Sequence, residues 1–480
     1  MSIAIRFAAV TALTLSCTSP IWAQATDAGA ARLKSALQTA LGSAEDAISV
    51  TTAGQDYALT LDLARLVARD GGPISMTASP IEARLTDNGD GTWSFSVDQP
   101  FSMNSAAEGA MQASTSLDSL TASGVFDETL GDMSRYSVQI AGLTNLSTRT
   151  DPAIGEVVTQ STVESIALEG GARAGTTGVD GAVTVTASGI AFDAGIPTAE
   201  GAGQMQISGG IAAFASSVAL TGYQPSALYP LLGWLLAHPG GTLSGADKVE
   251  LKARLEAALP IFAALSTQDS YSAISVVSPM GTFGLDGVDT VLEMTGAVPD
   301  GRLREALTFR GLTLPEGALP PYVAALIPEE LSLDVTLSNF DLAAATRLAL
   351  GLMDQPEAPP AMEIFGMQLL MALMPQGAVD ITLAPGGARN ATYDLTYEGA
   401  MRVGMGGMPS GTARIGLTGV DAIMAALFEA PPDVAGQILP LLGMAQAIGQ
   451  TGPDGELIWD IDATTPGSLR INGMEMMGMQ

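Results

Sequence analysis

The side chains that most often carry chemistry are scarce in this chain. His238 is its single histidine and Cys17 its single cysteine. One histidine excludes zinc sites built from His clusters and any chemistry that pairs two imidazoles. His238 stands before Pro239-Gly240 at the end of an apolar segment. This place is typical of a residue that interacts with the last carbonyls of a helix, rather than of a catalytic base.

Motifs for nucleophiles and phosphate binding are also absent from the sequence. No GxSxG, SxxK, Walker A or GxGxxG pattern stands in a strand–turn–helix context. Carboxylates are plentiful, so a hydrolase that uses two of them stays open as an alternative. However, acidic residues such as Asp87, Asp90 and Asp454 stand at turns, where they have local roles. We therefore predict no enzymatic activity, no catalytic residues and no cofactor.

The remaining candidate for a metal site is a Cu(I) site formed by methionine clusters, because thioether ligands select Cu(I). The clusters lie at 401–408 and 474–479. No histidine supports them, and the spacing of Met474 and Met476 is that of a strand. We expect apolar strand ends there and no metal site.

A further set of methionines lies on a predicted helix. Met362, Met367, Met371 and Met374 recur on one broad face. Either this helix is buried against a sheet, or it forms a flexible wall for acyl chains or another apolar ligand. The ligand hypothesis nominates five lining residues on three apolar helices: Leu232, Leu236, Leu369, Met371 and Leu442.

The formal net charge is −30, from 20 basic and 50 acidic residues. Such a chain repels nucleic acid and anionic headgroups at long range, so we predict no nucleic-acid partner. The acidic residues are spread along the chain, which is typical of a solubilising surface.

Residues 1–25 have the pattern of a secretory signal peptide. A singly charged start is followed by the apolar segment 7–16, by Pro20, and by small residues that allow cleavage after Ala23 or Ala25. We therefore predict a periplasmic protein whose mature form has no thiol, hence no disulfide. The alternative is a lipoprotein anchored at Cys17, but Thr14 stands where such signals favour Leu. No later segment has eighteen uninterrupted apolar residues, so the mature chain is predicted to have no transmembrane span.

The rest of the sequence predicts a β-rich domain over 26–205 and a repeat domain over 206–480. Asp87-Asn-Gly-Asp-Gly91 resembles a calcium loop, but Val97 replaces the glutamate at the twelfth position, so we expect a hairpin turn. Three segments share alternating β-branched and Leu residues followed by Ser/Thr and Gly/Asn: 218–224, 335–341 and 415–421. Each predicts a strand that turns into a helix, with Asp341 and Asp421 available as N-caps.

A second helix and a strand hairpin follow each copy, with the helices expected near 246–265, 361–374 and 433–448. The predicted fold class is therefore α+β. Mainly antiparallel twisted β-sheets are built from duplicated strand–helix–helix–hairpin units, with helices packed on one face.

Three segments also resemble a known family. Leu59-Thr-Leu-Asp-Leu63, Ile81-Glu-Ala-Arg-Leu-Thr-Asp-Asn-Gly-Asp-Gly-Thr-Trp93 and Leu469-Arg-Ile-Asn-Gly473 are similar to the extracytoplasmic domain-of-unknown-function family 2125. That family is associated with AsmA-like envelope proteins. The resemblance implies repeated β-units, periplasmic residence and a loose link to outer-membrane or lipid homeostasis. It supplies no catalytic residues, and the chain differs from AsmA in lacking a retained membrane anchor.

Together these observations lead to a functional hypothesis with two alternatives. The favoured one is an envelope protein that binds a lipid or another apolar ligand without catalysis. The first alternative is a structural or assembly factor that binds envelope proteins, and the second is the carboxylate-dependent hydrolase.

Overall fold

The computed structural model describes residues 25–41, 47–67, 74–107, 111–151, 155–197, 204–238, 243–353, 362–405, 409–453, 455–465 and 467–478. Residues 1–24 of the predicted signal peptide, Cys17 among them, lie outside the described residues. The chain divides into two compact units, unit 1 ending at Leu265 and unit 2 beginning at Ser266. The predicted boundary after residue 205 differs from this division. Residues 204–223 pair with the preceding strand, which places them in unit 1.

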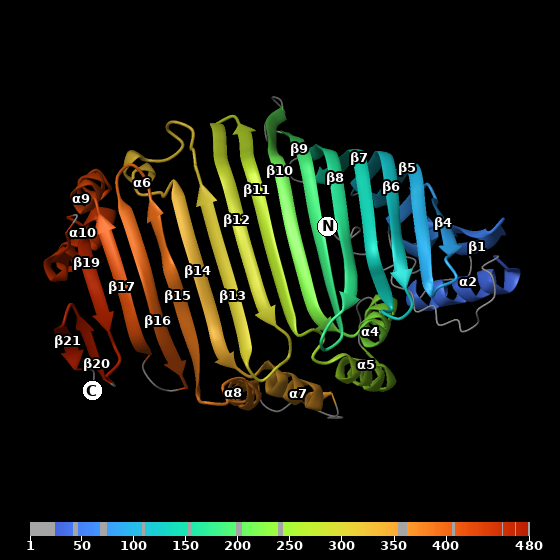
Figure 1. The fold of residues 1–480 in the computed structure, drawn as a ribbon. Helices are drawn as coiled ribbons and strands as arrows, with labels where there is room; N and C mark the ends of the chain where they lie inside the picture. Colours follow the sequence, from blue (N-terminus) through green and yellow to red (C-terminus); the bar gives the residue numbers. More distant parts are fainter. Residues whose placement is uncertain are drawn as a thin grey trace. The chain divides into compact units, whose positions relative to one another are not determined.

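Unit 1 consists mainly of long strands. Its elements are α2 (Asp27–Leu41), β1 (Ile48–Ala53), β2 (Asp56–Leu61), α3 (Leu63–Val67), β3 (Ile74–Ala78), β4 (Ile81–Asp87), β5 (Thr92–Ala107), β6 (Met111–Asp127), β7 (Asp132–Asp151), β8 (Gly155–Ala174), β9 (Val179–Pro197), β10 (Gln204–Tyr223), α4 (Pro225–Ala237) and α5 (Gly245–Ala258) (Figure 1).

The strands of unit 1 form an antiparallel sheet in the order β1, β2, β4 to β10, and β3 pairs with the far half of β5. The Asp87–Gly91 segment joins β4 to β5, and Gly89 and Gly91 have positive φ there. The predicted hairpin turn is thus confirmed. The main core of unit 1 lies where α2 packs on this sheet. Leu33 and Leu37 belong to one hydrophobic cluster with side chains from β1, β2, β4, β5 and β6.

A left-handed glycine interrupts the long strand β7. Gly142 has φ +63°, and a Cβ added to it would lie 2.0 Å from the Asp118 carboxylate of β6. Gly189 of β9 likewise has φ +60°, and its Cβ would meet Glu164 of β8. Only glycine combines this backbone conformation with so close an approach.

Unit 2 combines shorter strands with helix pairs. β11 (Ala264–Ser278) crosses the division between the units. The elements that follow are β12 (Gly281–Thr295), β13 (Gly301–Arg310), α6 (Pro321–Ala324), β14 (Glu330–Phe340), α7 (Leu342–Leu352), α8 (Met362–Leu373), β15 (Ala378–Arg389), β16 (Asp394–Gly404), β17 (Ser410–Thr418), α9 (Val420–Phe428), α10 (Pro432–Ile448), β18 (Gln450–Thr451), β19 (Leu457–Asp462), β20 (Ser468–Ile471) and β21 (Met474–Gly478).

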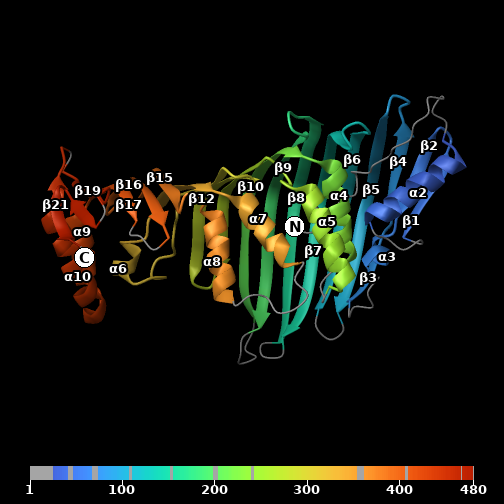
Figure 2. The same ribbon diagram turned by 90° about the horizontal axis from the view of Figure 1, so that it is seen from below.

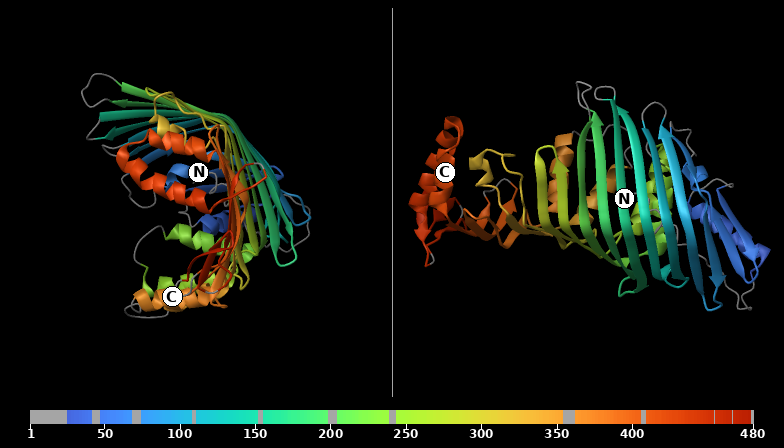
Figure 3. Two further views of the ribbon diagram at one scale, coloured as in Figure 1. Left: turned by 90° about the vertical axis from the view of Figure 1, so that its left-hand side faces the viewer. Right: turned by 90° about the horizontal axis from the view of Figure 1, so that it is seen from above.

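The sheet of unit 2 is also antiparallel. Its order is β12 to β17, then β19, β20 and β21, with β18 paired to β19. Figures 2 and 3 show α7 to α10 on one side of these strands. The prediction of an α+β fold with mainly antiparallel sheets is therefore confirmed. No helix within the described ranges is long and apolar enough to cross a membrane.

The three predicted strand-to-helix segments share a local geometry. Gly222, Asn339 and Gly419 occupy the same position in each, and all three have left-handed backbones, with φ of 67°, 66° and 79°. The next residue is buried in every case: Tyr223, Phe340 and Val420. A helix follows each junction, namely α4, α7 and α9. Duplication of the complete units stays a prediction.

Two helix ends differ from their predictions. Asp341 caps α7 by accepting a hydrogen bond from Ala344 N at 2.7 Å, but α9 begins at Val420, so Asp421 lies in its first turn instead of at its N-cap. The helix expected over 246–265 ends at Ala258. Pro260 explains the early end, because proline lacks the N–H that a helix interior requires.

Candidate functional site

The middle strands of unit 2 have one apolar and one polar face. β14 contains Leu331-Ser-Leu-Asp-Val-Thr-Leu337, in which aliphatic and polar residues alternate strictly. Successive side chains of a strand point to opposite faces of its sheet. The four aliphatic side chains therefore lie on one face, and Ser332, Asp334 and Thr336 lie on the other.

Strand register continues the apolar face across the sheet. Leu337 lies opposite Leu303 of β13 and opposite Ile381 of β15, and Ile381 lies opposite Met401 of β16. A second row crosses β16, β17 and β19 through Tyr397, Ile415 and Trp459. These rows define what we call the apolar sheet face of unit 2.

The centre of the apolar sheet face is incompletely buried. Leu333 keeps 37% of its surface exposed and Met401 keeps 46%, whereas Val379 near the start of β15 and Trp459 in the middle of β19 are buried. Complete burial of such a side chain stabilises a protein by about 1.5–3 kcal/mol relative to exposure. Apolar side chains that stay exposed do not contribute this stabilisation, and an exposed apolar patch often marks a binding site.

Helices contact this sheet at two places. Trp459 Nε1 in the middle of β19 donates a hydrogen bond of 2.8 Å to Ala445 O of α10, and Trp459 shares its face with Ile415. At the end of β14, Asp341 N donates to Leu373 O of α8 at 2.8 Å. The helices are thus fixed beside the sheet, while Leu333 and Met401 stay partly exposed.

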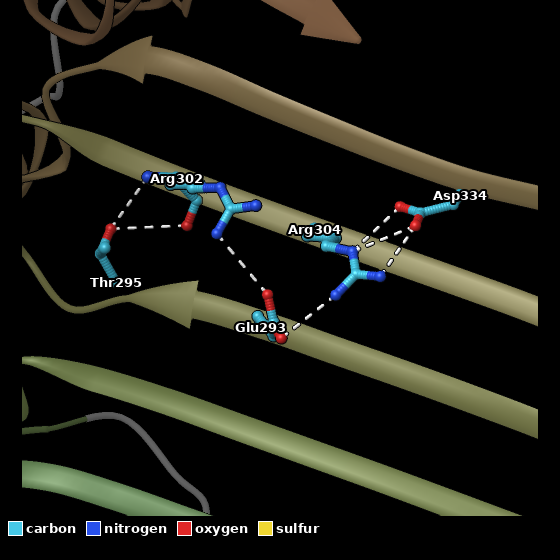
Figure 4. Close-up of polar contacts among 5 residues, drawn as sticks. All are labelled: Glu293, Thr295, Arg302, Arg304 and Asp334. Atoms are coloured by element: carbon cyan, nitrogen blue, oxygen red, sulfur yellow. Dashed lines mark hydrogen bonds and ion pairs between the residues drawn. The ribbon is translucent and has the colours of Figure 1, made fainter. Parts of the chain in front are cut away.

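The opposite face carries charge, with Arg304 of β13 at the centre of one group (Figure 4). Arg304 Nη2 donates to Asp334 Oδ2 at 2.8 Å, and Nη1 donates to Glu293 Oε1 at 3.2 Å. Arg302 Nη1 lies 3.6 Å from Glu293 Oε2. The hydrogen bond from Arg304 lowers the pKa of Asp334 below the ordinary value of an aspartate. These side chains remain partly exposed, so their attraction is weakened by solvent.

Other ion pairs lie on the same charged face. They join Arg310 to Asp289, Arg389 to Glu330, Arg402 to Asp380 and Arg414 to Asp460. Each arginine meets an acid on the neighbouring strand, which suits a face directed to water. The apolar sheet face is therefore the side of this sheet that is suited to an apolar ligand.

Unit 1 repeats this arrangement in part. Val138 of β7 lies opposite Leu168 of β8, which lies opposite Val185 of β9, and all three are half-buried. Val138 packs against the main core, so this apolar row continues from the region that α2 covers.

A buried carboxylate lies at the strand ends of unit 1. Asp132 Oδ2 accepts hydrogen bonds from the hydroxyl groups of Tyr223 and Tyr229, the latter at 2.8 Å, and Oδ1 accepts one from Met133 N. Burial, together with the carboxylate, raises the pKa of both phenols. The arrangement joins α4 to β7 and β10 through a carboxylate whose oxygens are both engaged.

The five residues predicted to line a ligand site lie on three helices. Leu232 and Leu236 belong to α4, Leu369 and Met371 to α8, and Leu442 to α10. Leu232 and Met371 are exposed, Leu369 and Leu442 are half-buried, and the side chain of Leu236 lies outside the description. Met367 on the predicted methionine face of α8 is 63% exposed. That face is therefore not buried against the sheet.

A pocket of about 380 Å³ lies between α4 and α5. Pro230, Ala253, Ala257 and Arg254 are among its lining residues, and Arg254 Nη1 donates to Pro230 O at 3.1 Å. None of the five predicted lining residues belongs to it.

His238 and the acidic side chains are the remaining candidates for catalytic or metal-binding roles. His238 Nδ1 lies 2.9 Å from Trp234 O, and the two rings stack with centroids 4.0 Å apart. The predicted contact of His238 with the last turn of its helix is confirmed. Within the described ranges, no three His, Cys, Asp or Glu side chains gather to hold a metal ion.

Sequence reasoning nominated helix residues and missed the sheet face. The apolar face of the sheet could have been predicted from the strict alternation of apolar and polar residues in 331–337 and in Leu395-Thr-Tyr397 of β16.

In comparisons with known proteins, no family model, curated protein or solved structure matches this chain.

Proposed function

We propose that this protein is a periplasmic envelope protein that binds a lipid or another ligand with an acyl chain, without catalysing a reaction. The observation that carries the proposal is the incompletely buried apolar sheet face of unit 2. Its row through Leu303, Leu337, Ile381 and Met401 contains only aliphatic and thioether side chains. Such side chains supply apolar area without fixing a polar orientation, which suits a flexible hydrocarbon chain.

The extent of the face is consistent with a long ligand. From β13 to β19 the sheet crosses five inter-strand steps of about 4.8 Å, or about 24 Å in total. This is the length scale of an extended fatty acyl chain. The predicted signal peptide and the resemblance to AsmA-like envelope proteins agree with a lipid ligand.

Native mass spectrometry of the protein purified from its own periplasm tests this proposal. We expect a fraction of the protein to carry an added mass that organic extraction removes and identifies as a lipid. The delipidated protein should then regain the mass on incubation with the same lipid. Protein that carries no lipid and takes none up would contradict the proposal.

A second candidate function is binding of another envelope protein. The exposed side chains of Ile364, Met367, Leu370 and Met371 on α8 favour it, because apolar patches also mark protein interfaces. Crosslinking in the periplasm from position 367 would distinguish the candidates. A single crosslinked partner would support the assembly factor, and crosslinks to lipid alone would support the favoured proposal.

A further inference from the structure

The hairpin of α9 and α10 exposes a series of large apolar side chains. Phe428 is 73% exposed at the end of α9, and Leu441 and Met444 on α10 are 63% and 56% exposed. Ile438, one turn before Leu441, is also exposed. Residues three or four apart lie on the same side of a helix, so the three α10 residues form one apolar stripe.

Both ends of this hairpin are held at the sheet. α9 begins directly after β17 at the left-handed Gly419. α10 returns to the sheet, where Trp459 donates to Ala445 O and Asn472 Nδ2 donates to Ile448 O at 2.9 Å. Figures 2 and 3 show both helices on one side of the neighbouring strands. Through Trp459 and Ile415, the hairpin adjoins the apolar sheet face.

The charges on the hairpin select among possible partners. Residues 420–448 contain Asp421, Glu429 and Asp433 and no Lys, Arg or His. An anionic surface would be repelled by these acids, because cationic side chains are what attract anionic lipids. The three residues of the stripe include no Trp, Tyr or Arg, the side chains most enriched at the binding hot spots of protein interfaces. A neutral, apolar environment is the partner that this composition fits.

We infer that the α9–α10 hairpin docks on the surface of a neutral lipid bilayer. Ile438, Leu441 and Met444 enter the boundary between headgroups and acyl chains, and Phe428 anchors the helix connection. α10 has 17 residues and contains Pro440, and no described helix is suited to cross a membrane, so α10 lies along the interface.

This inference rests on the proposed function and extends it. Lipids with long acyl chains are almost insoluble as monomers in water, so a protein that binds one must take it from a bilayer or return it there. A docked hairpin that adjoins the apolar sheet face would shorten the path of the lipid's acyl chain through water. The bilayer is therefore the source or the recipient of the lipid ligand.

Vesicle flotation with the full mature chain tests the docking. We expect co-flotation with phosphatidylcholine vesicles and weaker co-flotation with phosphatidylglycerol vesicles. The double variant Leu441→Glu/Met444→Glu should reduce the partition coefficient on phosphatidylcholine by about tenfold or more, since charges in this region are costly to insert. The matched control is Gly443→Glu/Gln446→Glu, which adds the same charge with the same spacing at two exposed positions on the side of α10 opposite the stripe and should have little effect. Circular dichroism confirms that both variants are folded.

Three results would overturn the inference. The first is that the wild type does not float with phosphatidylcholine vesicles. The second is that the test and control variants lose vesicle binding to the same extent. The third is that the wild type forms a concentration-dependent dimer and binds no vesicles, and that the test variant abolishes this dimer. The last result would assign the stripe to a second copy of the chain. Bound lipid in native mass spectrometry without flotation would leave the proposed function standing and remove only the docking, whereas flotation without bound lipid would remove the proposed function.

Discussion

Tyr229 of α4 donates a hydrogen bond of 2.8 Å to Asp132 of β7, which is 97 residues earlier in the chain. Tyr223 at the end of β10 donates to the same carboxylate oxygen. The helix is therefore joined to the sheet by a polar contact inside an otherwise apolar packing. A buried acceptor that loses its donor costs more than the net value of the bond, which makes this contact a sensitive test of the fold.

The first prediction concerns this contact. Tyr229→Phe removes one donor and should lower the free energy of unfolding by about 1–2 kcal/mol in urea denaturation. A double-mutant cycle with Asp132→Asn isolates the interaction and should show a coupling of at least about 0.5 kcal/mol. Additive losses would show that the hydrogen bond contributes nothing specific.

The second prediction concerns alkaline pH. Burial and the neighbouring carboxylate raise the pKa of Tyr223 and Tyr229 in the folded protein, so the folded state keeps protons that the unfolded state releases above about pH 10. Stability should be unaffected by these groups below pH 10. Above it, each phenol should decrease stability by up to about 1.4 kcal/mol per pH unit. Denaturation of Tyr223→Phe/Tyr229→Phe between pH 9 and pH 11 should give a flatter profile, and an unchanged slope would contradict the assignment.

The third prediction concerns the charged face of unit 2. Because the hydrogen bond from Arg304 lowers the pKa of Asp334, its carboxyl group should titrate below an ordinary aspartate in a carbon-detected NMR experiment. Arg304→Gln should return the pKa of Asp334 towards the ordinary value. Arg302→Gln is the control, since the nearest acid to Arg302 in this group is Glu293, and it should shift Asp334 less. The pair contributes stability above the unfolded pKa, and this contribution is lost as the pH falls through the folded pKa.

The fourth prediction separates backbone strain from steric overlap. Gly142 and Gly89 both have positive φ, but only Gly142 would place a Cβ against another residue, the carboxylate of Asp118. Gly89→Ala should cost about 1–2 kcal/mol from the left-handed conformation alone. Gly142→Ala should cost clearly more in the same urea titration, because the sheet must also shift. Equal losses would mean that β6 and β7 adjust freely.

The fifth prediction concerns the apolar sheet face. Leu333→Glu/Met401→Glu places two carboxylates on that face, and Ser332→Glu/Ala400→Glu places them one residue away on the charged face. We expect the first variant to lose bound lipid by at least about tenfold in native mass spectrometry, because a buried unpaired charge is strongly unfavourable. The second variant should keep the lipid. Retention by both variants would remove the sheet face as the binding site.

Much of the local structure follows from short stretches of sequence. Strict alternation in β14 predicts a two-faced strand, and Asp87–Gly91 predicts the turn between β4 and β5. The segments around 222, 339 and 419 predict strands that turn into helices, and in the structure the Gly or Asn of each junction has a left-handed backbone. These features depend on the conformational preferences of a few adjacent residues, so they can be predicted without knowledge of the fold.

Other features depend on contacts between distant segments. The Met and Leu residues of α8 have the period of a buried helix, yet Met367 and Met371 are exposed, because periodicity shows that a helix has an apolar face and not what covers it. The engagement of Asp132 by two tyrosines more than ninety residues away depends on where β7, β10 and α4 end.

The sequence by itself determined which side-chain types and motifs are scarce in this protein, the alternation of its strands and the positions of several turns. Tertiary structure decided which strand neighbours which, and hence that Leu303, Leu337, Ile381 and Met401 form one row. It also decided that Leu333 and Met401 on that face stay partly exposed beside the helices. The physical reason is that strand register and helix docking are set by the packing of residues far apart in the chain, whereas propensity acts only between near neighbours.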